Sequence, residues 1–107
     1  MLKFMVVVYR LPGLTPDQFR RHMRDTHSPL AMSLPGLRKY VQNFAGKDAT
    51  RQPPGWDAIV ELYFDDRPSM EAAWASPQGA ASDADLAIFA DLSRTTWSVV
   101  DEVTVLE

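Results

Sequence analysis

The first apolar segment constrains the fold most, because it predicts a strand that needs an apolar cover on each face. Residues Lys3–Arg10 (KFMVVVYR) are apolar at nearly every position and rich in β-branched side chains. Such strands are usually buried on both faces. The chain has 107 residues, of which 46% are hydrophobic, and this length suits one domain. We therefore expect a single domain over residues 1–107.

A strongly signalled helix follows this strand. The turn Leu11–Leu14 (LPGL) ends the strand. Thr15 is placed to cap a helix, with Pro16 at its first position, and Gln18 completes a capping box with Thr15. Phe19, Met23 and His27 recur at four-residue spacing and so share one stripe. Pro29 is expected to break or redirect the helix, which resumes briefly through Leu34.

The remaining elements are read from the same kinds of signal. Pro and Gly between residues 47 and 55 predict a mobile loop, Lys47–Gly55, and Asp66 opens a helix with Met70, Ala73 and Trp74 on one stripe. Leu37–Ala45 alternates, with Tyr40, Gln42 and Phe44 on one side. The predicted elements are strands at Leu37–Ala45, Ala58–Phe64 and Thr95–Leu106, and a helix from Asp66 that restarts at Ser76-Pro77 and runs to about Ala90.

The order β-α-β-β-α-β predicts an α+β protein of the ferredoxin-like class. Its antiparallel sheet carries helices on one face only. The other face of the sheet still holds Val, Ile, Tyr and Trp side chains, more apolar surface than a small sheet leaves in water. We therefore expect a homodimer in which two chains pack through their sheet faces, as in a dimeric α/β barrel.

Composition excludes several classes of function. The net charge is -3 with interspersed signs, so no basic stripe indicates nucleic-acid binding. There is no Cys, which excludes disulfides and thiolate chemistry. The apolar run Phe4–Val8 is too short to span a membrane and lacks the features of a signal peptide, so a cytoplasmic location is the default expectation. His22 and His27 are five residues apart, about 140° around an α-helix, and cannot share a ligand, so no metal site is predicted.

His27 is the strongest candidate for chemistry. An imidazole held against apolar neighbours can act as acid or base near neutral pH, although a histidine bonded to backbone fits the same pattern. Tyr40 on the following strand is its best partner, or else a core tyrosine. Tyr9 could line the same cavity or simply pack.

Glu61 is a carboxylate inside an apolar strand, which leaves two roles open. It could be a general base with a raised pKa. It could equally pair with Arg38, Lys39 or Arg94 across the sheet or the dimer interface.

Several stretches resemble the EthD family of dimeric α/β-barrel proteins, over almost the whole chain. The most specific are the strand-PGL-helix opening, the HxPL motif at His27–Leu30, the LPGLRKY step ending at Tyr40, and the late ASP…DLAIFAD segment. The resemblance implies a ferredoxin-like fold dimerised through its sheets, with a pocket between sheet and helices in each subunit.

A small protein that the sequence also resembles, methylmuconolactone methylisomerase, works without metal or cofactor through acid–base residues in this pocket. By that resemblance its helix histidine falls on His27 and its tyrosine on Tyr40. The chain departs from that enzyme in lacking a second pocket histidine, where Trp56 is the nearest prominent residue, and in having Ser33 where an acidic side chain would be sought. Haem-binding relatives use a histidine on a later helix, and the second half of this chain has none.

These observations favour a cofactor-independent acid/base enzyme, of isomerase, cyclase or lyase type. Its substrate would be an apolar oxygenated compound such as an aromatic, lactone or polyketide degradation intermediate. His27 would move a proton and Tyr40 would donate a hydrogen bond. The residues expected to contact substrate are Tyr9, Phe19, Met23, Trp56 and Trp74. Two alternatives stay open: a non-catalytic dimeric binding or accessory protein, and a cofactor-free monooxygenase.

Overall fold

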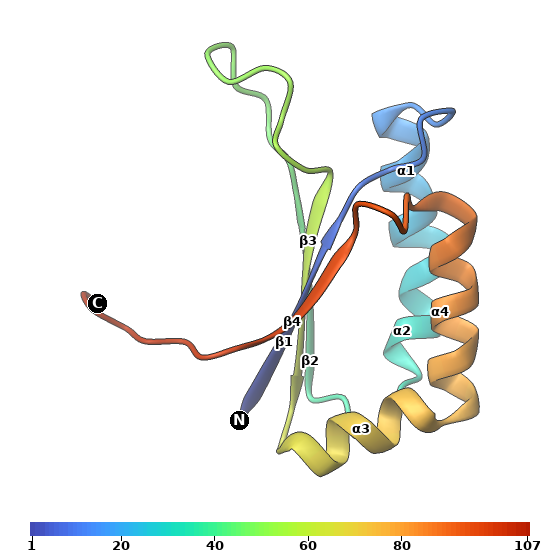
Figure 1. The fold of residues 1–107 in the computed structure, drawn as a ribbon, viewed down its shortest axis with the longest axis vertical. Coiled ribbons are helices and arrows are strands. Elements are labelled where there is room, and N and C mark those ends of the chain that lie inside the picture. The colour runs from blue at the N-terminus through green and yellow to red at the C-terminus, as the bar shows by residue number, and fades with distance from the viewer.

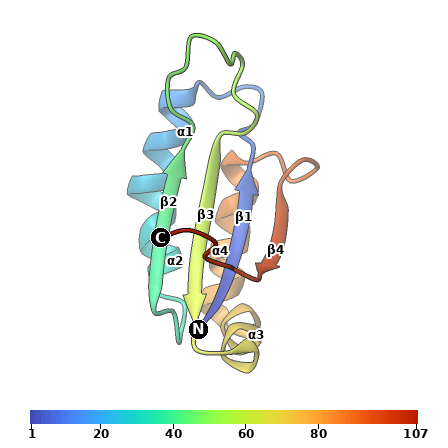
Figure 2. The same cartoon turned by 90° about the vertical axis from the view of Figure 1, so that its left-hand side faces the viewer.

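Four antiparallel strands form one sheet in the computed structural model, which describes residues 1–107. The strand order is β2-β3-β1-β4, so the first and third strands are central (Figure 2). This is the ferredoxin-like arrangement predicted from the element order. The strands are β1 (Leu2–Val8), β2 (Lys39–Phe44), β3 (Ala58–Phe64) and β4 (Thr96–Val100).

All helices cover the same face of this sheet (Figure 1). One long helical segment follows β1, and a second, bent one follows β3. The segments are α1 (Pro16–His22), η1 (Met23–His27) and α2 (Ser28–Met32), then α3 (Arg67–Ala75) and α4 (Pro77–Phe89). No helix is both long and apolar enough to cross a membrane.

The core lies between the sheet and these helices. On β3 the side chains alternate strictly, with Ala58, Val60, Leu62 and Phe64 buried on the helix side. Their neighbours on the strand point to the opposite face and are half-buried. The helices contribute Phe19, Met23, Met70, Ala73, Leu86 and Phe89 to the same cluster.

The outer face of the sheet is covered by no element of the chain (Figure 2). Val6 and Val8 of β1 are buried against the helices, whereas Met5 and Val7 on the outer side are only half-buried. The predicted burial of the first strand on both faces is therefore not achieved within one chain.

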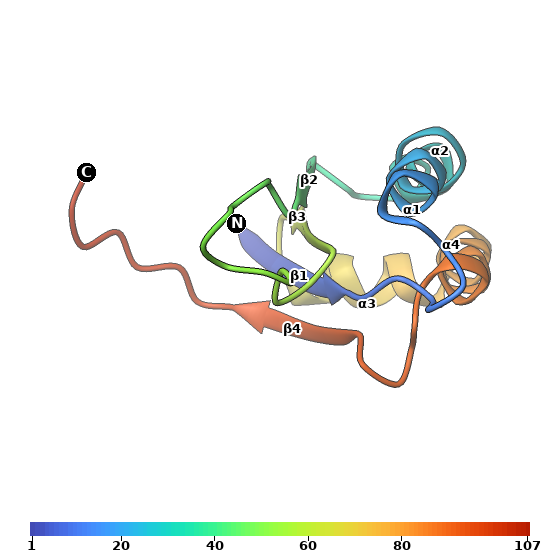
Figure 3. The ribbon, with the colours of Figure 1, turned by 90° about the horizontal axis from the view of Figure 1, so that it is seen from above.

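The last strand is shorter than predicted. Val100 pairs with Lys3, near the start of β1, so the residues after Val100 have almost no partner strand left. Residues 101–107 instead extend away from the sheet, on the side opposite the helices (Figures 1 and 3). Their apolar side chains are open to solvent, with Val103 77% and Val105 91% exposed.

Pro29 does not break the first helical segment. The helix passes through one π-helical turn, η1, in which the Ser28 N–H donates to the Met23 carbonyl five residues back. The Ser28 hydroxyl donates to the same carbonyl at 2.9 Å. Pro29 then lies in the first turn of α2, the part of a helix in which proline is tolerated. The segment ends at Met32, two residues before the predicted Leu34.

Candidate functional site

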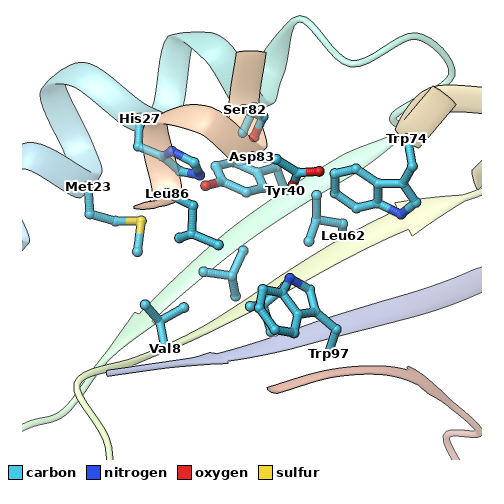
Figure 4. Close-up of a pocket in the computed structure, with 13 residues that line it drawn as sticks. Val8, Met23, His27, Tyr40, Leu62, Trp74, Ser82, Asp83, Leu86 and Trp97 are labelled. Carbon is cyan, nitrogen blue, oxygen red and sulfur yellow. The ribbon is translucent and has the colours of Figure 1, made fainter. Parts of the chain in front are cut away.

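His27 and Tyr40 line one cavity between the helices and the sheet, the inner pocket. Its volume is about 30 Å³, room for a group the size of a water molecule. Most of its wall is apolar, and Figure 4 shows the two polar rings with Met23 and Trp74 around the space. The remaining lining residues are Val6, Val8, Ala31, Val60, Leu62, Ser82, Asp83, Leu86 and Trp97.

The His27 imidazole is held by a buried carboxylate. Its Nδ1 lies 2.8 Å from Oδ2 of Asp85, and the two residues are only 8% and 6% exposed. A carboxylate accepts, so Nδ1 carries the proton and the neutral ring keeps the lone pair of Nε2. Asp85 therefore selects the tautomer that can accept a proton at Nε2.

Burial lowers the pKa of His27 from its ordinary value of 6.5, because the charged imidazolium is poorly solvated. The hydrogen bond to Asp85 acts in the opposite direction but does not cancel it. His27 is consequently neutral at pH 7 and suited to act as a general base.

His22 shares the same carboxylate, which the sequence-based argument had excluded. Its Nε2 lies 3.0 Å from Oδ1 and 3.1 Å from Oδ2 of Asp85. The expectation of a 140° separation assumed an α-helix. The π-turn η1 contains about one more residue per turn, so residues five apart come to the same side. No group of three or more metal-ligating side chains is placed to hold an ion.

Tyr40 reaches the inner pocket from β2. Its hydroxyl accepts a hydrogen bond from Nε2 of Gln42 at 2.9 Å, and Figure 4 shows it directed toward His27. Burial raises the pKa of Tyr40, so its phenol keeps the proton that it can donate. Gln42 Nε2 is also within hydrogen-bond distance of the Met23 carbonyl and the Ser28 hydroxyl, at 3.2 and 2.8 Å. It thereby joins Tyr40 to the π-turn that carries His27.

An outer cleft of about 300 Å³ adjoins the inner pocket. The two spaces share Trp74, Asp83, Leu86 and Trp97, and the cleft adds Phe4 and Leu92. Trp74 packs on Phe4 with ring centroids 5.5 Å apart. The inner pocket and the outer cleft together form a narrow polar end with a wider aromatic entrance, the usual anatomy of a small-molecule site.

Three other predicted contact residues lie outside this site. Phe19 is in the core, with its ring 5.5 Å from that of Phe89. Tyr9 and Trp56 are brought together, but at a separate depression beside the β2–β3 loop. There the Arg94 guanidinium lies 4.2 Å above the Tyr9 ring. Tyr9 comes just after β1 and Trp56 just before β3. Both therefore lie at the end of the sheet that carries the β2–β3 loop, away from the inner pocket.

Glu61 is on the outer face of the sheet, not in the pocket. Its Oε1 is 2.7 Å from Nζ of Lys3, and this bond lowers the pKa of Glu61 to about 2. A general base with a raised pKa is therefore contradicted. The partner also differs from the three cations expected, since β1 lies directly beside β3 and Arg38 pairs with Asp65 instead.

Asp85 and Asp83 were missed by sequence reasoning. A signal was present for Asp85, because it lies beside the apolar Leu86 and Phe89, at positions i+1 and i+4, in the predicted helix. A carboxylate in such a position needs a buried partner.

The fold and the site define a class: a ferredoxin-like α+β protein with a His27–Asp85 pair and Tyr40 beneath an aromatic cleft. Residues 11–93 match the EthD domain, and the chain belongs to this family. An uncharacterized 11.0 kDa protein of Rhodococcus erythropolis, from the thcB-thcC intergenic region, is 34% identical over 104 residues, 95% of this chain and 96% of that protein.

Solved structures agree with this assignment. An EthD family protein from Bacillus halodurans superposes with a TM-score of 0.80 and 26% identity, over 96% of this chain and all of the other. A dimeric ferredoxin-like protein of unknown function from Thermobifida fusca gives 0.69 and 18%, over 92% and 88%. SnoaB, a cofactor-independent oxygenase from Streptomyces nogalater, gives 0.66 and 13%, over 99% and 97%. The last two share the fold.

Proposed function

We propose that the chain is a small acid/base enzyme that acts on an apolar oxygenated molecule, with His27 as the base and Tyr40 as the hydrogen-bond donor. The observation that carries this proposal is the 2.8 Å contact between His27 Nδ1 and the buried Asp85. A purely structural histidine does not need a second buried ionisable group to orient it. Here that group leaves Nε2 free on the pocket side.

The inner pocket has room for the carbonyl oxygen of a ligand, whose remaining atoms would lie toward the outer cleft. His27 Nε2 takes a proton from the carbon next to the carbonyl, and the electron pair of that C–H bond moves to form an enolate. The Tyr40 O–H donates a hydrogen bond to the enolate oxygen, and Asp85 stabilises the resulting imidazolium. His27 then returns the proton to carbon, at the same or another position. At the end of the cycle the His27 ring is again neutral, the Tyr40 hydroxyl still carries its proton, and Asp85 is again a carboxylate.

Exchange of carbon-bound hydrogen for deuterium tests this chemistry before the substrate is known. We would incubate tetralone, an apolar aromatic ketone, with the protein in deuterated water and follow its α-hydrogens by NMR. The wild type is expected to accelerate exchange well beyond an equal concentration of free imidazole. His27→Gln should lower the rate by at least about a hundredfold, the contribution expected of a positioned base.

Three further variants separate the roles. Tyr40→Phe and Asp85→Asn should each slow exchange while leaving the base in place. Ile88→Gln, on the exposed side of α4, is the matched control and should exchange like the wild type. Wild-type exchange no faster than with imidazole, or equal rates for His27→Gln and the wild type, would contradict the proposal.

A second candidate, a non-catalytic binding protein, is favoured by the small volume of the inner pocket, about 30 Å³. A binder needs the outer cleft but no titrating His27, so ligand affinity would survive His27→Gln while exchange activity would be absent from the start. The fold likeness to a cofactor-independent oxygenase adds a third outcome. Oxygen uptake with a phenolic compound would support it.

We further propose that two copies of this chain form a homodimer through the outer faces of their sheets. The apolar centre of that face, Met5, Val7, Val41 and Ile59, is half-buried and covered by no element of its own chain. The dimeric ferredoxin-like neighbour supports this arrangement. The pocket is on the helix side of the sheet, so such a dimer would leave it open.

A further inference from the structure

We propose that Asp83 makes the site specific for uncharged aromatic hydroxy-carbonyl compounds and excludes carboxylates. This inference rests on the proposed function and names its substrate class. Asp83 lies where the inner pocket meets the outer cleft, since it lines both. Figure 4 draws it beside Tyr40 and Trp74 at this junction.

The charge of the lining carries the argument. No Lys or Arg lines either space, and Asp83 has no hydrogen-bond or ion-pair partner in the protein. Asp83 as a whole is exposed at the mouth of the site. Partial burial of its carboxyl raises the pKa of Asp83, while His27 acts in the opposite direction. Asp85, the other acid near His27, is occupied by the two imidazoles. An anionic ligand would therefore meet an unpaired carboxylate and no compensating cation, which is unfavourable.

Shape and hydrogen bonding define what fits instead. The inner pocket admits one oxygen-sized group near His27 and Tyr40. The outer cleft of about 300 Å³ offers Trp74, Trp97 and Phe4 to a flat ring. Asp83, an acceptor at the junction, can take a hydrogen bond from a hydroxyl on that ring. The compound that satisfies all three features is a neutral aromatic ring with one carbonyl and one hydroxyl group.

Binding of three matched probes tests this specificity without requiring turnover. The probes are para-hydroxyacetophenone, acetophenone and para-acetylbenzoate, used at about pH 6, where benzoates are ionised and phenols are not. We would follow the indole N–H signals of ¹⁵N-labelled protein by NMR. Trp74 and Trp97 should shift, whereas Trp56, at the separate depression, serves as an internal control. Para-hydroxyacetophenone should bind tightest, and para-acetylbenzoate at least about tenfold more weakly, about 1.4 kcal/mol.

Asp83→Asn should bring the affinity of para-acetylbenzoate to within about threefold of that of acetophenone. Asp25→Asn removes the same charge from the exposed surface of η1, away from the cleft, and should keep the wild-type order. Equal affinity of the three probes for the wild type, an unchanged order in Asp83→Asn, or no shift of Trp74 and Trp97 would each overturn the inference. Because these signals report binding alone, failure here is distinct from failure of deuterium exchange.

Discussion

At the scale of single residues, the carboxylate of Asp85 controls the site. It is almost completely buried and contacts two imidazoles, those of His22 and His27. Removing one member of such a group leaves the others buried without a partner. The chemistry at Nε2 of His27 thus depends on a residue that never faces the cavity.

The pH dependence of stability should report the burial of His27. An unfolded chain has a His pKa of about 6.5, whereas burial lowers the pKa of His27 in the folded protein. Above about pH 6.5 both states are neutral. As the pH falls, the unfolded state binds a proton that the folded state does not, so the free energy of unfolding decreases.

Urea unfolding between about pH 7 and about pH 5 measures this effect. The wild type should lose stability on acidification more steeply than His27→Gln, which lacks the buried imidazole. His22→Gln retains His27 and separates the contribution of the neighbouring imidazole. Parallel curves for the wild type and His27→Gln would show that His27 titrates normally.

The sequence placed His27 and Tyr40 on one cavity but could not supply their partners. Four-residue spacing locates His27 on the inner stripe, and strand alternation locates Tyr40 on the inner face. Asp85 is 58 residues away in the chain, so only the packing of α4 on η1 reveals the contact. Tyr9 was expected either to line the cavity or to pack, and Trp56 was considered only through the resemblance. Both residues instead line the depression beside the β2–β3 loop.

At the scale of elements, Gln42 connects β2 to the π-turn. Its amide lies within hydrogen-bond distance of the Tyr40 hydroxyl, the Met23 carbonyl and the Ser28 hydroxyl. The two catalytic candidates come from different elements, and this amide ties their positions together. We expect the strand and the helix to lose their mutual alignment without it.

Gln42→Leu should therefore destabilise the protein by about 1–3 kcal/mol, the usual cost of leaving buried polar groups unpaired. The free energy of unfolding in urea measures this loss. Gln78→Leu makes the same exchange on the exposed side of α4 and should change stability little. Equal effects of both variants would mean that the Gln42 bonds are not stabilising.

Element order and strand alternation were predictable because they depend on local pattern. The capping box at Thr15 marks the start of α1, and β3 occupies the predicted range Ala58–Phe64. The π-turn was not predictable, since a proline in a helix permits a break, a kink or a widened turn. The length of β4 depends on where its partner β1 begins.

At the scale of the whole molecule, the uncovered sheet face and the exposed end of the chain point the same way. Both lie on the side opposite the helices (Figure 3). The Lys3–Glu61 ion pair sits on this face beside the apolar centre. In a sheet-to-sheet dimer it would be partly desolvated and would favour one orientation of the two copies.

Light scattering should give a mass twice the 12.0 kDa of one chain at micromolar concentration. Ile59→Arg places a charge at the centre of the outer face and should yield the single-chain mass. Ile88→Arg makes the same change on α4, where Ile88 is 65% exposed, and should remain dimeric. A wild-type mass of 12.0 kDa would contradict the dimer.

The π-turn also has a consequence for how such a site could arise or disappear. The helical segments before and after it are out of phase by one residue, as if a single amino acid had been inserted into an α-helix. Deleting one residue there would restore a regular α-helix in which the two histidines, then four residues apart, would still share one face. A single-codon deletion, rather than a substitution, is thus the smallest genetic event that would remove the π-turn while keeping the two histidines side by side.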